Sequence, residues 1–285
     1  MPLFWDRIYR AASTKIHFVT TPTNQRALFE KVLKLGFGIA KQLSAELEGF
    51  SDPKEMPFHM QAVGETYLRA ISFYRAILFL AEKRIFLSEP MALLRALLED
   101  ALRLTLIADM DESDRVNAIA TWNIDGINRG EGIMVHSAEK LGLGTEETRK
   151  EFAEAFAQDR ARWERYRTEG STGKANKVLI NSNALREKAK EVGMEKDWWM
   201  HDMGDQTIHG SLLARSYARA EGEPGVTTLS AGQEHPNALI DIINHAAHTV
   251  VLAHKHTWRM FDLKSESELL QRGLSRITEL AVEFE

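Results

Sequence analysis

The sequence predicts an all-α protein, a multi-helix bundle of about nine helices, on three observations. Apolar residues recur at helical spacing along nearly the whole chain. Residues suited to a strand are confined to the short stretch 226–229. The expected helices are joined by short connectors, and hydrophobic residues make up 44% of the 285 residues, enough to fill the core of a bundle.

The apolar spacing places the expected helices in order along the chain. They cover residues 25–48, 58–86, 88–108, 113–141, 145–167, 182–192, 197–220, 236–261 and a last helix from 265. The helix within 91–108 is apolar on nearly all sides, so we expect it at the centre of the bundle.

Capping residues and helix breakers define several of these ends. The third helix begins sharply at Ser88-Glu89-Pro90, a cap residue followed by an acid and a proline in the first turn. Ser113 can cap the fourth helix, although three glycines between 126 and 132 weaken its middle by roughly 1 kcal/mol each. Ser265 and Glu268 form a capping box for the last helix.

No repeat or firm boundary divides the chain, so we expect one helical domain over residues 1–285. The best linker candidate is the Gly-rich segment 169–174, and a sub-boundary would fall near 169–181. Residues 1–22 are rich in aromatic side chains and fit none of the expected helices.

Composition excludes several classes of protein. The chain has no cysteine, which rules out disulfides, Cys-ligated zinc, iron–sulfur clusters and a Cys nucleophile. A net charge of −5 argues against non-specific coating of nucleic acid, although a local basic patch could still bind it. No run approaches the roughly 18 apolar residues of a membrane span, and no signal peptide is recognisable. We therefore expect a cytoplasmic protein without a membrane partner.

A line of charges crosses the otherwise apolar third helix. Arg95, Glu99 and Arg103 recur every four residues and so share one face. A solvated edge of ion pairs is one explanation, with each pair contributing a few tenths of a kcal/mol. On so apolar a helix we instead expect Glu99 to be at least half buried, paired with Arg95, Arg103 or a histidine of a later helix.

The helix at 197–220 carries a polar stripe. His201, Asp205 and His209 are also spaced by four residues, beside an apolar face. Histidine and aspartate one turn apart can share a metal ion or a proton, whereas a surface stripe is the commoner outcome for an amphipathic helix.

The helix at 236–261 repeats this pattern with Asp241, His245 and His248 on one face. Facing His/Asp stripes are how helical bundles build metal sites, so the six residues of the two stripes form a candidate site for a divalent metal. We expect one polar pocket that also receives Glu99 and is lined by Asp205, His209, Asp241, His245 and His248. The Glu-x-x-His pattern of di-iron proteins and the His-Glu-x-x-His pattern of zinc proteases are both absent from the sequence. On the same helix, His254 points to the apolar side and is predicted to be a core histidine.

Two short motifs resemble those of other helical enzymes. The adjacent pair His201-Asp202, with His136 and Asp241, resembles the His and Asp set of the HD phosphohydrolases. Arg129 and His136 lie within the Arg-x(4–6)-His window of the HEPN ribonucleases, which need no metal because the histidine acts in acid–base catalysis and the arginine steadies the phosphate. The alternative for the second motif is a flexible helix end.

Two longer segments resemble a bacterial family known only as domain of unknown function 5677. The segment 91–110, MALLRALLEDALRLTLIADM, is similar to its Arg-x3-Glu helix, and the segment 205–217, DQTIHGSLLARSY, is similar to a later part with a histidine. The resemblance implies a helical fold and makes Arg95, Glu99 and His209 the family's characteristic polar positions. These three are the predicted catalytic residues.

Three classes of function fit these observations. The first is a hydrolase of phosphoesters or nucleotides that uses a divalent metal bound by His and Asp. The second is a metal-independent ribonuclease of the HEPN kind. The third is a non-enzymatic interaction or regulatory bundle, which could form a homo-oligomer. Bound metal, RNA cleavage that survives a chelator, or neither would separate the three.

Overall fold

The computed structural model describes residues 22–47, 56–83, 88–167, 178–208, 236–263 and 268–282, apart from the side chains of residues 22, 23, 88, 203–208, 236 and 237. All regular structure in these ranges is helical. In chain order the elements are α2 (Pro22–Leu47), α3 (Phe58–Glu82), α4 (Ser88–Asp109), α5 (Glu112–Glu131), the π-helix η2 (Gly132–Ser137), α6 (Ala138–Leu141), α7 (Glu146–Glu164), α8 (Ser182–Glu191), α9 (Glu195–Ile208), α11 (Pro236–Met260) and α12 (Glu268–Val282).

The predicted all-α bundle is confirmed. Within the described ranges there are nine helices when α5, η2 and α6 are counted as the single continuous helix that the sequence predicts. The predicted extension of α9 to residue 220, the weak strand signal at 226–229, the linker candidate at 169–174 and the segment 1–21 lie outside the described residues. None of the described helices is long and apolar enough to cross a membrane.

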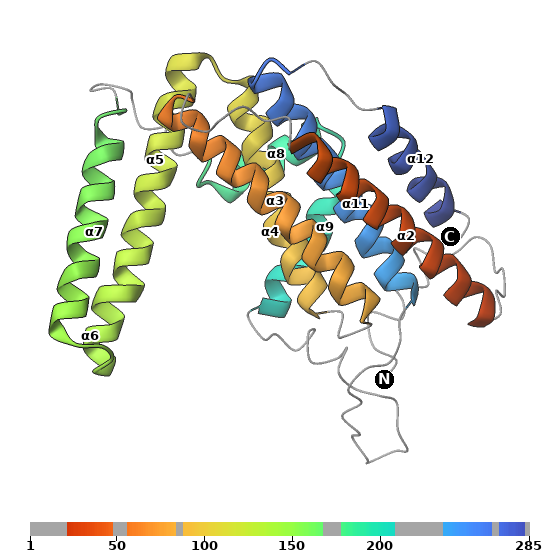
Figure 1. Cartoon of the computed structure of the whole chain (residues 1–285), viewed down its shortest axis with the longest axis horizontal. Coiled ribbons are helices and arrows are strands. Elements are labelled where there is room, and N and C mark those ends of the chain that lie inside the picture. The colour runs from red at the N-terminus through yellow and green to blue at the C-terminus, as the bar shows by residue number, and fades with distance from the viewer. Residues whose placement is uncertain are drawn as a thin grey trace, which may run out of the picture.

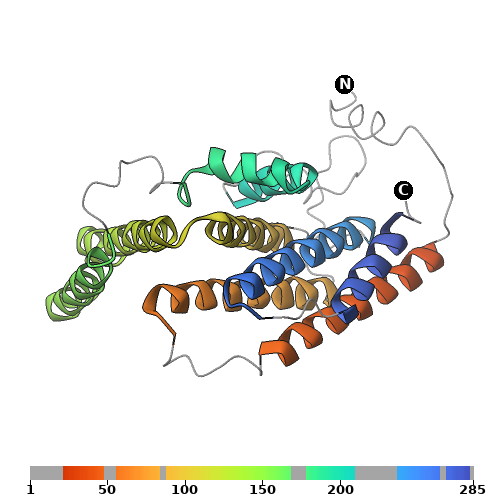
Figure 2. The same ribbon diagram turned by 90° about the horizontal axis from the view of Figure 1, so that it is seen from above.

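Helix α4 lies at the centre of the fold, as predicted. Leu94, Leu97 and Leu104 are almost completely buried along it. Figure 2 shows three layers, with α8 and α9 on one side of α4 and α11, and α2 and α3 on the other. Because α4 is covered on opposite sides by α3 and α9, its charged residues must meet those two helices rather than solvent alone.

Helices α5 and α7 form an antiparallel hairpin that projects from the rest of the molecule (Figures 1 and 2). The predicted helix over 113–141 changes at Gly132 to one π-helical segment before its left-handed C-cap at Gly142, φ 67°. Phe58 of α3 packs on the base of the hairpin, with its ring centroid 4.4 Å from that of Trp163. The glycines therefore shift the helical register without ending the helix.

The histidine predicted to lie in the core is found there. His254 of α11 is buried, with its Nδ1 2.7 Å from the Tyr67 hydroxyl and its Nε2 3.0 Å from the Glu46 carboxylate. A hydroxyl that donates to Nδ1 leaves the ring proton on Nε2, facing the carboxylate. Burial and the nearby Glu46 charge raise the pKa of Tyr67, so the hydroxyl keeps its proton.

Candidate functional site

The charged line on α4 is an ion-pair network around one carboxylate. Glu99 Oε2 accepts from Arg103 Nη2 at 2.7 Å, and Glu99 Oε1 lies 3.4 Å from Arg95 Nη2. The Glu99 side chain is 21% exposed. The predicted pairing of Glu99 is therefore confirmed, and the line is half-buried between helices rather than solvated.

A histidine from α9 completes the surroundings of Glu99. His201 Nε2 lies 3.0 Å from Glu99 Oε1, and its ring stacks on Trp198 with 4.1 Å between centroids. Its Nδ1 lies 3.4 Å from Asp202 Oδ1. Because a carboxylate only accepts, the Nε2 proton points at Glu99, so the 3.4 Å approach of Arg95 Nε to the same nitrogen is a contact and not a hydrogen bond.

These partners keep Glu99 ionised. Burial alone would raise its pKa, but the hydrogen bond from His201, the charge and hydrogen bond of Arg103 and the charge of Arg95 together lower it to about 2. The carboxylate can therefore orient His201 throughout the ordinary range of pH.

A second carboxylate beneath the line was not predicted from the sequence. Asp100 is buried and accepts two hydrogen bonds of 2.7 Å from Arg69 of α3. Arg103 also reaches Asp100, at 3.3 Å, and both guanidinium groups lie over the Trp122 ring. The signal was present, because Asp100 falls on the most apolar face of α4, three residues after Leu97. This second pair fixes Arg103 against Glu99.

Helix α9 makes a second polar contact one turn before His201. Asp197 Oδ1 lies 2.5 Å from His245 Nδ1 of α11, and both side chains are largely covered. Sequence reasoning placed Asp197 only at the start of its helix, where an acid suits the helix dipole. Asp197 and His201 are four residues apart, so one face of α9 meets both α11 and α4. We call this contact region, with Arg95, Glu99, His201, Asp197 and His245, the α9 seam.

The other residues of the predicted metal set are placed differently or are not described. His248 faces α12, where its Nε2 lies 2.9 Å from the Thr278 hydroxyl, and Asp241 is exposed. The side chain of Asp205 and all of His209 lie outside the described residues. No three His, Asp or Glu side chains in the described ranges are grouped so that they could hold a metal ion. The six-residue metal set stays a prediction.

The two short enzyme-like motifs are not assembled at the α9 seam, although His201 of the first motif lies there. His136 is exposed on η2, near the end of the projecting hairpin and away from α9 in both views (Figures 1 and 2). Arg129, two turns before it, pairs with Asp125 at 2.6 Å on the surface. His136 therefore does not join His201 and Asp202, and the HEPN-like pair lies on a separate part of the molecule.

The fold and the α9 seam define an all-helical protein with a histidine–carboxylate site between two packed helices. The model of the family of unknown function DUF5677 matches residues 60–224, more than half of the chain, and the chain belongs to this family. That range runs from the first turn of α3 through α9, and so includes Arg95, Glu99 and His201, but it ends before α11 and His245. No curated protein and no solved structure matches the chain.

Proposed function

We propose that the protein is a metal-independent hydrolase of phosphoesters whose active site is the Arg95–Glu99–His201 part of the α9 seam. The observation that carries the proposal is the hydrogen bond between Glu99 and His201 at 3.0 Å, with the Arg95 guanidinium 3.4 Å from both partners. A histidine held by a carboxylate is the usual arrangement of a general base, and a neighbouring arginine suits a phosphate.

Each of these three side chains would have its own role in the reaction. Glu99 fixes the ring through Nε2 and leaves Nδ1 to exchange a proton. Nδ1 removes a proton from water or a substrate hydroxyl, that oxygen bonds to phosphorus, and the leaving oxygen departs and takes a proton from solvent. The protonated ring then lies between Glu99 and Asp202, and Arg95 neutralises the charge that builds on the phosphate oxygens.

The charges around Glu99 favour an anionic substrate over a divalent metal at this position. Arg103 occupies Oε2, while His201 and Arg95 lie at Oε1. A metal ion bound to Glu99 would have to displace one of these partners and lie beside two guanidinium groups. Arg95 is only partly buried, so an anion can reach it from the edge of the seam.

Hydrolysis of bis(p-nitrophenyl) phosphate and of short single-stranded RNA, each with and without EDTA, tests the proposal. We expect hydrolysis of at least one of the two that survives the chelator, and a loss of about 100-fold or more in kcat for His201→Gln. Arg95→Gln should raise KM about tenfold, because it removes the cation that binds the phosphate.

His248→Gln is the matched control, since it removes a histidine that faces α12 instead of the α9 seam. It should keep the wild-type rate. Activity that disappears with EDTA would favour a metal-dependent hydrolase, and full activity of His201→Gln would place the chemistry elsewhere. No turnover of either substrate would contradict the proposal.

A further inference from the structure

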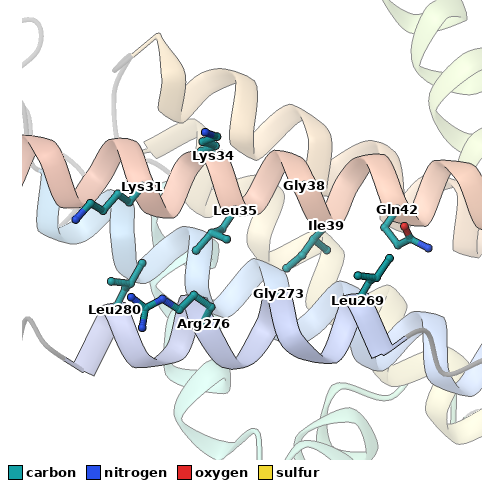
Figure 3. A pocket seen from close by; sticks show the side chains of 10 residues that line it. All are labelled: Lys31, Lys34, Leu35, Gly38, Ile39, Gln42, Leu269, Gly273, Arg276 and Leu280. Atoms are coloured by element: carbon teal, nitrogen blue, oxygen red, sulfur yellow. The ribbon is translucent and has the colours of Figure 1, made fainter.

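A groove of about 590 Å³ runs between α2 and α12, on the far side of the fold from the α9 seam. Figure 3 shows its walls. Leu35 and Ile39 of α2 face Leu269 and Leu280 of α12 across it. Its volume lies within the range of small-molecule sites, and its lining is mainly apolar.

We propose that this groove binds a single-chain amphiphile with an anionic head, namely a long-chain fatty acid. The site is separate from the proposed active site and does not depend on it.

Positive charge gathers at one end of the groove. Lys31 and Lys34 project from α2, and Arg276 projects from α12 (Figure 3). Neither lysine forms a salt bridge with another described residue, and Arg276 pairs with Glu279 at 2.6 Å, where both side chains are exposed. A carboxylate at this end would meet Lys31 and Arg276, whose interactions with it are strengthened by the apolar wall beside them, while Lys34 lies on the side of α2 away from α12 (Figure 3).

The opposite end suits the tail of such a ligand. Gln42 borders it, but the Gln42 amide already donates to Glu46 at 3.0 Å. From Lys31 to Gln42 the α2 wall spans eleven residues, or ~16 Å, which matches the extended length of a fatty acid of about twelve carbons. Charge at one end and aliphatic side chains along the rest fit an amphiphile rather than a compact anion.

Gly36 and Gly38 of α2 differ in the space around them. Gly36 allows close packing, because a Cβ at that position would lie 2.6 Å from Leu78 Cδ2. A Cβ at Gly38 would meet nothing within 4 Å, and Gly38 lines the groove. Packing therefore does not require glycine at position 38, where it makes the helix less stable than alanine would. A larger side chain at this position would fill the groove without clashing with the core.

Binding of dodecanoate below its micelle concentration, followed by isothermal titration calorimetry, tests the proposal. We expect saturable binding to one site, and weaker binding by three- to fourfold for each methylene removed in decanoate and octanoate, which is the fold-change given by about 0.8 kcal/mol per methylene. Dodecanol should bind at least tenfold more weakly, because it lacks the charge that Lys31 and Arg276 attract.

Three variants locate the site. Gly38→Leu should abolish binding while leaving the melting temperature equal or higher, and Lys31→Glu should weaken binding about tenfold. Lys41→Glu, an exposed lysine of the same helix that does not line the groove, should bind like wild type.

Four results would overturn the proposal. They are no binding of dodecanoate, equal binding of dodecanol, binding that Gly38→Leu leaves unchanged, and a dimer of the chain that Gly38→Leu dissociates. The last result would identify a second copy as the occupant of the groove.

Discussion

The described part of the chain contains two histidine–glutamate pairs of the same length in very different surroundings. Glu46–His254 and Glu99–His201 each join a carboxylate oxygen to Nε2 at 3.0 Å. In the first pair the other ring nitrogen is bound by the buried Tyr67 hydroxyl. In the second, the other ring nitrogen faces Asp202, whose side chain is 55% exposed.

This difference separates a structural pair from one that can do chemistry. His254 is 3% exposed and enclosed by α2, α3 and α11, so both of its nitrogens face protein groups and are closed to a substrate. His201 is almost as well covered, at 9%, but its Nδ1 faces the half-exposed Asp202 side chain, 3.4 Å from Oδ1. A histidine–carboxylate distance alone therefore does not identify a catalytic pair. What distinguishes a catalytic pair is an accessible second ring nitrogen, because a general base must reach the proton that it removes.

The largest effect is expected where the pair is most enclosed. His254→Leu should reduce the free energy of unfolding by about 3–5 kcal/mol, because it leaves the Glu46 carboxylate and the Tyr67 hydroxyl without their buried partner. Urea denaturation followed by circular dichroism measures this change.

The double variant Glu46→Met/His254→Leu is the control for this change. It should recover part of the loss, because both polar partners are then gone. A double variant as unstable as the sum of the single changes would show that the two side chains are not coupled.

A smaller effect with a distinct pH dependence is expected for Glu99→Gln. The pKa of Glu99 is lowered from its ordinary 4.5 to about 2, so its contribution to stability is fully present above about 4.5 and is lost as the pH falls towards 2. At pH 7 the variant should be roughly 1–3 kcal/mol less stable than wild type, since a half-buried charged hydrogen-bond acceptor is replaced by a neutral one.

Urea denaturation at pH 7, 4 and 2.5 measures that difference, which should shrink steadily between pH 4.5 and 2. A difference that stays constant over this window would mean that the folded protein does not hold Glu99 as an anion.

The sequence predicts the helices well because their signals are local. Apolar spacing and caps located α4 as the central helix and placed its start at Ser88, within the described residues. The buried state of His254 followed from its position on the apolar face of α11. The sequence also predicted that Glu99 would be paired, because a partly buried charge on so apolar a helix is stable only with a partner.

The identity of most partners could not be predicted, because it depends on how helices far apart in the chain rotate against each other. Asp197 and His245 are 48 residues apart, and Arg69 and Asp100 are 31 apart. His245 and His248 share a face of α11, yet they turn to α9 and α12, since three residues rotate a side chain by about 60° from its neighbour. A polar stripe therefore shows which side chains share one face of a helix. It does not show how many neighbouring helices those side chains contact.

The smallest effect is expected for His248→Gln, a histidine without a direct carboxylate partner in the described structure. Its Nε2 lies 2.9 Å from the Thr278 hydroxyl, and glutamine can keep a hydrogen bond there, so at pH 8 we expect a loss of stability under about 1 kcal/mol.

Burial lowers the pKa of His248, and the charge of His245 lowers it further, while the charge of Asp197 raises it. As the pH falls below about 6.5, the unfolded chain therefore binds a proton before the folded protein does, and the histidine makes the wild type less stable. Urea denaturation at pH 8 and pH 5 should show wild type losing its small advantage over the variant at the lower pH. If the wild type instead became more stable relative to the variant at pH 5, His248 would have a negatively charged partner, like the two histidines that pair with glutamates.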